Sequence, residues 1–182
     1  MTKRAAAHIQ GRKRDLLAGE QTLANPQDIA GHHQLRIGAK RLRYTMEICD
    51  LAYDKQLGGA IQAVKKVQTL LGDIHDCDVW AECAEAFMEQ ERLRTIEYFG
   101  HHGPFNRLKP GLQLLIDERR QRRDEIFMYL VAYWETLSTN HLWGHLDAVL
   151  QSCAEGSRRP ETKTEEVPSH GPEEDTDEDR PN

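Results

Sequence analysis

Apolar residues recur at helical spacing through most of the first 154 residues, and this periodicity constrains the fold more than any other feature. Its clearest example is a stripe of Leu35, Ala39, Leu42, Met46, Cys49 and Tyr53. At about 100° per residue these positions share one face of a helix. No segment alternates apolar and polar residues for long enough to predict a strand. The pattern therefore predicts an all-α fold, an antiparallel bundle of long helices.

Glycine, proline and aspartate residues mark the expected helix ends. We expect helices over about 2–23, from after Gly31 to about 53, from after Gly59 to about 71, over 111–137 and over 141–153. The stretch from Gly72 to Asp76 is a candidate break, and Asp76 or Asp78 then caps a continuation to about residue 99. Residues 100–110, with two glycines and two prolines, are expected to form a loop.

The charge distribution divides the chain into a bundle, 1–154, and an acidic tail, 155–182. The tail holds ten acidic and four basic residues, which accounts for the net charge of −6. Without aromatic residues it is expected to be disordered. Two roles stay open for the tail: competition for a basic pocket, or solubility alone.

Several features point to a cytoplasmic protein without a membrane anchor. The four cysteines are scattered and form no Cys-x-x-Cys pair, which is typical of a reducing compartment. No apolar run approaches the roughly 18 residues that span a membrane. The basic N-terminus lacks the apolar core of a secretory signal.

The helix expected after Gly31 carries a second stripe, which is basic. His33, Arg36, Lys40 and Arg43 lie within roughly 80° of each other on the helical wheel. Like charges at this spacing cost a few tenths of a kcal/mol per pair. A bound anion would reverse that sign. The alternative is a solvated basic face with Glu47 as a partial counterion.

Basic residues also lie on or beside the apolar stripes of three other helices. Arg119 and Arg123 fall on the stripe of the helix over 111–137, Arg12 lies at the edge of the first stripe, and Lys65 flanks the stripe of Ile61, Val64, Val67 and Leu71. An inward charge is costly unless it is paired or solvated. Two interpretations stay open: an electropositive, water-filled pocket, or buried salt bridges to Asp73, Asp76, Asp78 or Glu47.

Phosphate is the anion that suits such a pocket. Arginine presents a fork of donors to phosphate oxygens, lysine adds a point charge, and His33 would donate as imidazolium. A linear phosphate polymer needs donors spread along a path, and several helices supply them.

Two motifs resemble the CHAD family, the conserved histidine α-helical domain, over roughly residues 5–137. The first is His33-x-x-Arg36-x-x-x-Lys40-Arg41-Leu42-Arg43-Tyr44, and the second runs from Val64 through Gln68 and Leu71-Gly72 to Asp76-x-Asp78-Val79. The resemblance implies a helical bundle that binds inorganic polyphosphate in a basic groove, and association with polyphosphate granules. By motif match, the resemblance implies that the binding residues include His33, Arg36, Lys40, Arg43 and Lys65. Three further candidates are predicted from their positions on or beside the apolar stripes: Arg12, Arg119 and Arg123.

The chain departs from the family in having one histidine signature and no second copy, so we expect a single bundle. A homodimer that completes the groove is a hypothesis. We expect no catalytic residues, no cofactor and no metal site, because Asp73, Asp76 and Asp78 also read as helix caps and no P-loop occurs. Nucleic acid, RNA ahead of DNA, is a less favoured partner, since few exposed aromatics are available for stacking.

Overall fold

The computed structural model describes residues 2–156, with side chains described over 3–152, and within this range it is helical without a strand. The elements are α1 (Thr2–Ala18), the 3₁₀ helix η1 (Glu20–Ala24), α2 (Ile29–Cys49), the 3₁₀ helix η2 (Asp50–Tyr53), α3 (Gly58–Phe99), α4 (Gly103–Thr139) and α5 (Leu142–Gly156). The predicted all-α fold of long helices is confirmed.

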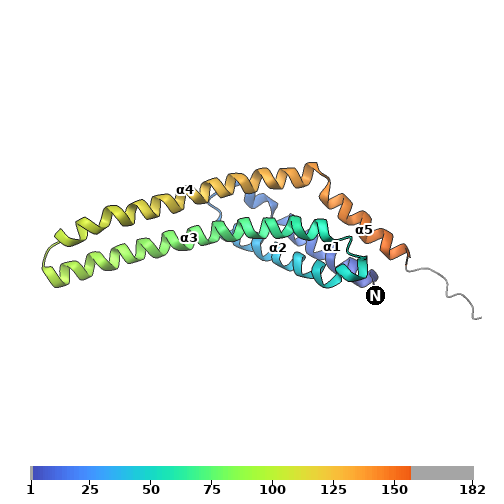
Figure 1. The fold of residues 1–182 in the computed structure, drawn as a ribbon, viewed down its shortest axis with the longest axis horizontal. Helices are drawn as coiled ribbons and strands as arrows, with labels where there is room; N and C mark the ends of the chain where they lie inside the picture. The colour runs from blue at the N-terminus through green and yellow to red at the C-terminus, as the bar shows by residue number, and fades with distance from the viewer. Residues whose placement is uncertain (1, 157–182) are drawn as a thin grey trace, which may run out of the picture.

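Two long helices organise the molecule. Figure 1 shows α3 and α4 running side by side in opposite directions, with α2 packed along only the N-terminal half of α3 and α1 packed against α2. The short α5 continues from the end of α4 at an angle to it and contacts α1. The C-terminal half of α3 and the N-terminal half of α4 project beyond the other helices as a slender two-helix arm.

The predicted apolar stripes form the core. Leu35, Ala39, Leu42 and Met46 of α2 are all buried against α3 and α1. The stripe positions Ile61, Val64, Val67 and Leu71 of α3 are buried as well, as are Ile126, Phe127, Leu130 and Trp134 of α4. Each such side chain contributes about 1.5–3 kcal/mol when fully buried. Polar links add to this core, including the Lys13–Asp147 ion pair of 2.6 Å between α1 and α5.

The connection between the first two long segments differs from the expectation. The helix predicted over 2–23 ends at Ala18 and continues only as the 3₁₀ helix η1. The next helix begins at Ile29, before Gly31, because Asp28 is its N-cap and accepts a hydrogen bond of 2.9 Å from the Gly31 amide. An aspartate whose side chain accepts a hydrogen bond from the backbone amide three residues later is a strong signal for the start of a helix.

The predicted break at 72–76 is wrong, because α3 runs without interruption for 42 residues. Glycine inside a helix costs about 1 kcal/mol and the aspartates could have capped a new helix. However, Leu70, Leu71, Ile74 and Cys77 continue the buried stripe across the expected break. Burial of these four side chains outweighs the local preference for a turn.

The predicted loop over 100–110 is also largely wrong. Only residues 100–102 are non-helical, with Gly100 in the left-handed conformation at φ 72°. α4 begins at Gly103 with Pro104 in its first turn and includes Pro110. A proline removes one hydrogen bond to the preceding turn and disfavours a helix interior. Burial of Phe105 anchors the helix ahead of Pro110.

The predicted tail, 155–182, lies outside the described residues except for its first two, which end α5. The proposed domain boundary therefore stays a prediction. Within residues 2–156, no helix is both long enough and apolar enough to cross a membrane.

Candidate polyanion-binding site

The basic stripe of α2 faces a matching set of positions on α3. The His33 and His75 rings lie 5.8 Å apart between centroids. One turn further along α2, the side chain of Arg36 lies over Gly72, where an added Cβ would be 3.8 Å from Arg36 Nε. These two contacts define an antiparallel register. From helical spacing, the same register would place Gln68 opposite Lys40 and Lys65 opposite Arg43.

We call this surface the basic face: His33, Arg36, Lys40 and Arg43 of α2 with Lys65, Gln68, Gly72 and His75 of α3. Both sets have the same spacing of three, four and three residues, which keeps each set on one side of its helix. Ten residues of helix correspond to about 15 Å. The basic face is therefore a strip of donors, and five of the eight predicted binding residues lie on it.

Most cations of the basic face have no acidic partner. Within the described part of the chain, Arg36, Lys40 and Lys65 form no ion pair. Arg43 is the exception: its Nη1 lies 3.4 Å from Glu47 Oε1, and its guanidinium lies 4.4 Å from the Tyr44 ring centroid. His75 Nδ1 lies 3.3 Å from Asp76 Oδ1. Glu47 is thus the partial counterion that the solvated-face alternative expected, and it pairs with Arg43 alone of these four cations; both alternatives stay open for the three unpaired cations.

A hollow and two unpartnered polar atoms also lie on this surface. A hollow of about 580 Å³ opens at its end beside His33 and His75, lined also by residues 29–31 and 34. In addition, Arg43 Nε and Gln68 Oε1 are buried and have no hydrogen-bond partner among the described residues. Buried polar atoms of this kind are usually satisfied by a ligand or ordered water.

Arg12 lies apart from the basic face. It borders a smaller hollow of about 180 Å³ between α1 and α2, together with Asp15, Gln34, Gly38 and Arg41. Arg12 Nη1 also lies 3.4 Å from Asp15 Oδ2, in an exposed ion pair. Arg12, on α1, therefore lies beside a different side of α2 from the one that carries the basic face. Its role in binding stays a prediction.

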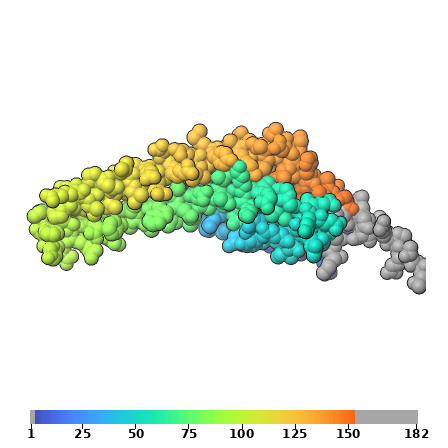
Figure 2. All heavy atoms as spheres, in the orientation of Figure 1, coloured from blue at the N-terminus to red at the C-terminus, as the bar shows by residue number. Residues whose placement is uncertain are grey.

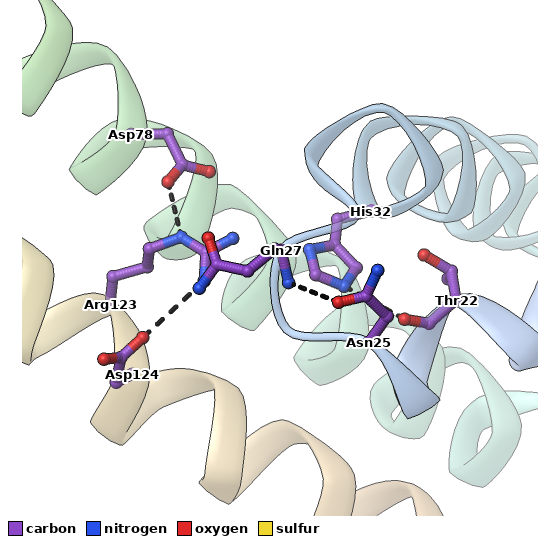
Figure 3. Close-up of polar contacts among 7 residues, drawn as sticks. All are labelled: Thr22, Asn25, Gln27, His32, Asp78, Arg123 and Asp124. Atoms are coloured by element: carbon purple, nitrogen blue, oxygen red, sulfur yellow. Dashed lines mark hydrogen bonds and ion pairs between the residues drawn. The ribbon is translucent and has the colours of Figure 1, made fainter.

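Arg123 occupies the buried ion pair that the sequence left open as an alternative. It is only 5% exposed, and its Nε donates to Asp78 Oδ1 of α3 at 2.5 Å. Asp124 lies 3.7 Å from its Nη1. Figure 3 shows the guanidinium between these two carboxylates. The structure thus gives Arg123 a role in joining α4 to α3.

Arg119 lies on α4, one turn before Arg123. It is beside a different side of α3 from the one that carries the basic face. It is near enough to the Cys77 thiol to affect it: burial, the largest influence, raises the pKa of Cys77, whereas Arg119 opposes that rise. Cys77 follows the basic-face residue His75 by two positions, or about 200° around the helix. Arg119 and the basic face are therefore separated by α3 itself.

His32, the neighbour of the motif histidine, has a structural position. It is 3% exposed, its Nε2 lies 3.2 Å from the Thr22 carbonyl oxygen, and its ring stacks at 5.1 Å on Phe127. Burial lowers the pKa of His32, with a smaller contribution from Arg123. A neutral His32 therefore ties η1, α2 and α4 together, while His33 on the adjacent side is exposed.

Sequence reasoning missed Gln68 and His75 as members of this surface. Their signal was present, since Lys65, Gln68, Gly72 and His75 repeat the spacing of the α2 stripe. Gly72 leaves room for Arg36 to lie across α3. Among the described residues, no group of three or more His, Cys, Asp or Glu side chains is arranged to hold a metal ion.

Comparison with known families identifies the N-terminal part of the chain. Residues 1–85 match the family model of the CHAD domain. This part of the chain is similar to a CHAD domain. The match covers α1, α2 and α3 as far as residue 85, whereas the motif resemblance was expected to reach about residue 137. No curated protein and no solved structure matches the chain.

The CHAD match includes every residue of the basic face. Arg12 also lies within it, whereas Arg119 and Arg123 lie beyond its end. The basic face therefore lies wholly within the part of the chain that is similar to a CHAD domain.

Proposed function

We propose that this protein binds inorganic polyphosphate through the basic face, without catalysing a reaction on it. The observation that carries the proposal is that Arg36, Lys40 and Lys65 have no acidic partner within the described residues, although they lie beside Arg43 and two histidines. Such a set of cations repels itself until an anion lies along it.

The shape of the basic face favours a slim, linear anion. Its donors follow two adjacent helices over about 15 Å. Arginine and lysine side chains engage successive phosphate groups by charge-assisted hydrogen bonds. The hollow beside His33 and His75 provides space for the end of such a chain. The resemblance to the CHAD family supports the same ligand, and we propose that binding takes place in the cytoplasm at polyphosphate granules.

Nucleic acid is the alternative ligand, since any polyanion is attracted to this charge. Stacking of unpaired bases requires exposed aromatic rings. Near the basic face the available ring is Tyr44, which is 43% exposed and already faces Lys40 and Arg43. A single ring supports little base stacking, and this favours polyphosphate over RNA.

The proposal is tested by calorimetric titration with long-chain polyphosphate at two salt concentrations, beside tRNA and duplex DNA at matched phosphate concentration. Lys40→Ala is the test variant, and Lys109→Ala, an exposed lysine of the arm, is the control with the same loss of charge. We expect Lys40→Ala to weaken polyphosphate binding about threefold to tenfold. Lys109→Ala should bind like the wild type.

Equal weakening in both variants would reduce the basic face to a generic cationic surface. Tighter binding to tRNA than to polyphosphate would favour nucleic acid as the ligand of the basic face. Incubation with polyphosphate followed by gel electrophoresis tests the absence of catalysis: the chain-length distribution should stay unchanged, and shortening or extension would contradict the proposal.

A further inference from the structure

The two-helix arm consists of residues 79–99 of α3 and 103–122 of α4. Figure 2 shows it as a narrow extension in which the two helices cover each other and leave their outer sides bare. On one side the connection before α2 reaches its base, where Gln27 and Ile29 share a hollow with Val79, Glu82 and Glu85. Beyond this base, Figures 1 and 2 show no other helix beside the arm.

Exposed apolar side chains are concentrated on this arm. Fourteen large hydrophobic residues are exposed among the described residues, and eight of them lie on the arm: Val79, Trp80, Phe87, Leu93, Tyr98, Phe99, Leu108 and Leu114. The arm holds little more than a quarter of the described residues, so this is a marked excess. Clusters of this kind on a soluble surface usually mark an interaction site.

Part of this apolar surface forms a stripe. Trp80, Cys83 and Phe87 follow each other at three and four residues, so they lie on one side of α3. Trp80 is 60% exposed and Phe87 46% exposed. By contrast, Ala81 and Ala84 are buried toward the interior of the arm. The small residues thus face inward, while the large aromatic residues face away from the α3–α4 contact.

The charges of the arm are divided between its two helices. Residues 79–99 hold five acidic and two basic residues, whereas residues 103–122 hold five basic and two acidic residues. One helix therefore has a net charge of −3 and the other a net charge of +3. A surface with this division is complementary to its own copy, which is the condition for a twofold symmetric interface.

We infer that the arm is the homodimerisation surface of this protein, with α3 of one copy lying on α4 of its partner. This arrangement joins the acidic helix to the basic helix at both contacts and covers the apolar stripe. Two antiparallel pairs stacked in this way form a four-helix bundle, in which each helix buries the side that is bare in the monomer.

The available area is sufficient for a stable contact. A specific interface covers roughly 800 Å² on each partner. Fully buried aromatic side chains contribute about 150–250 Å² each. Trp80, Phe87 and Tyr98 are each about half exposed or more, so they supply roughly half of the required area, and the polar and charged side chains around them complete the contact.

This inference is independent of polyphosphate binding, because the arm and the basic face occupy different parts of α3. It also differs from a dimer that completes a groove, since the basic face need not meet its copy. Dimerisation is therefore measured without polyphosphate, and a negative result would leave the proposed function intact.

The test is sedimentation equilibrium of the full chain over a range of concentrations, with three kinds of variant. Phe87→Glu should weaken dimerisation by about thirtyfold or more, as for a central aromatic contact. Met128→Glu, at an exposed apolar position of α4 outside the arm, is the matched control and should dimerise like the wild type. Far-ultraviolet circular dichroism confirms that each variant is folded.

Charge reversal tests the pairing of the helices directly. A chain with Glu89→Lys and Glu97→Lys has two basic helices in its arm, and a chain with Arg107→Glu and Lys109→Glu has two acidic ones. Each alone should dimerise more weakly than the wild type, and an equimolar mixture should form heterodimers. A wild-type chain that stays monomeric, or a dimer that is insensitive to Phe87→Glu and to both charge reversals, would overturn the inference.

Discussion

The ion pair between Arg123 and Asp78 gives the sharpest prediction for stability. Its side chains are 7% and 17% exposed, and it joins α4 to α3 near the start of α2. Replacing Arg123 by methionine keeps most of the apolar volume but leaves the Asp78 carboxylate without its main partner. The same position was predicted from the sequence as a ligand contact, so stability and binding measurements distinguish the two roles.

The expected loss can be estimated from the burial of the pair. Removing one member of a buried ion pair costs about 3–5 kcal/mol, because the remaining charge is desolvated and unpaired. Asp78 retains some contact with solvent, so we expect Arg123→Met to lie at the lower end, about 3 kcal/mol. Arg36→Met on the basic face, where no ion pair is lost, should change stability by less than about 0.5 kcal/mol.

Urea unfolding followed by circular dichroism measures both changes. Adding Asp78→Asn to Arg123→Met removes the stranded charge, and the double variant should recover part of the lost stability. Polyphosphate affinity should fall in Arg36→Met and stay near the wild-type value in folded Arg123→Met. If Arg123→Met were as stable as the wild type and lost affinity instead, Arg123 would be a ligand contact and the structural reasoning would be refuted.

Three further predictions follow from local geometry. Gly31→Ala should destabilise the protein by about 1–2 kcal/mol in urea unfolding, because the added Cβ would lie 2.1 Å from Oδ2 of the N-cap residue Asp28. Gly72→Ala is the matched control: its Cβ would have Arg36 Nε as its nearest atom, at 3.8 Å, so the change should be neutral or stabilising by up to about 1 kcal/mol. Burial lowers the pKa of His32, so on acidification the unfolded chain binds a proton at a higher pH than the folded chain does, and stability should fall as the pH drops below about 6.5. His32→Gln should therefore reduce the change in the urea midpoint between pH 7.5 and 5.5. A thiol reagent should modify the exposed Cys83 before Cys77, because burial raises the pKa of the Cys77 thiol; mass spectrometry of cleaved peptides would detect the reverse order.

The sequence was sufficient to predict helix type and the buried faces. Periodicity predicted the stripe of Leu35, Ala39, Leu42 and Met46, and all four are buried. Helix ends were harder to predict, because they depend on a competition between local and tertiary preferences. At Gly72 and at Pro110 the local signal favoured a break, yet both helices continue. Burial of the surrounding stripe explains this at Gly72, whereas the residues just after Pro110 are not buried.

The candidate site was predicted in part. Helical spacing is enough to bring His33, Arg36, Lys40 and Arg43 together, because they share one helix. Whether a residue on another helix joins them depends on the rotation of that helix, which spacing alone does not give. His75 of α3 lies beside His33 of the stripe, whereas Arg123 of α4 turns to Asp78, and only the packed arrangement of the helices distinguishes these outcomes.

The unbroken α3 has a consequence for how long polymers would be held. It places the basic face, centred near Gln68, about 30 Å along one rigid helix from Phe87 on the arm. Two chains joined through their arms would therefore present two basic strips at a fixed separation. A polymer long enough to reach both would make its second contact at high effective concentration, and its affinity would exceed that of a short chain by avidity. Chain-length selection would then be a property of the helix length and not of any single contact.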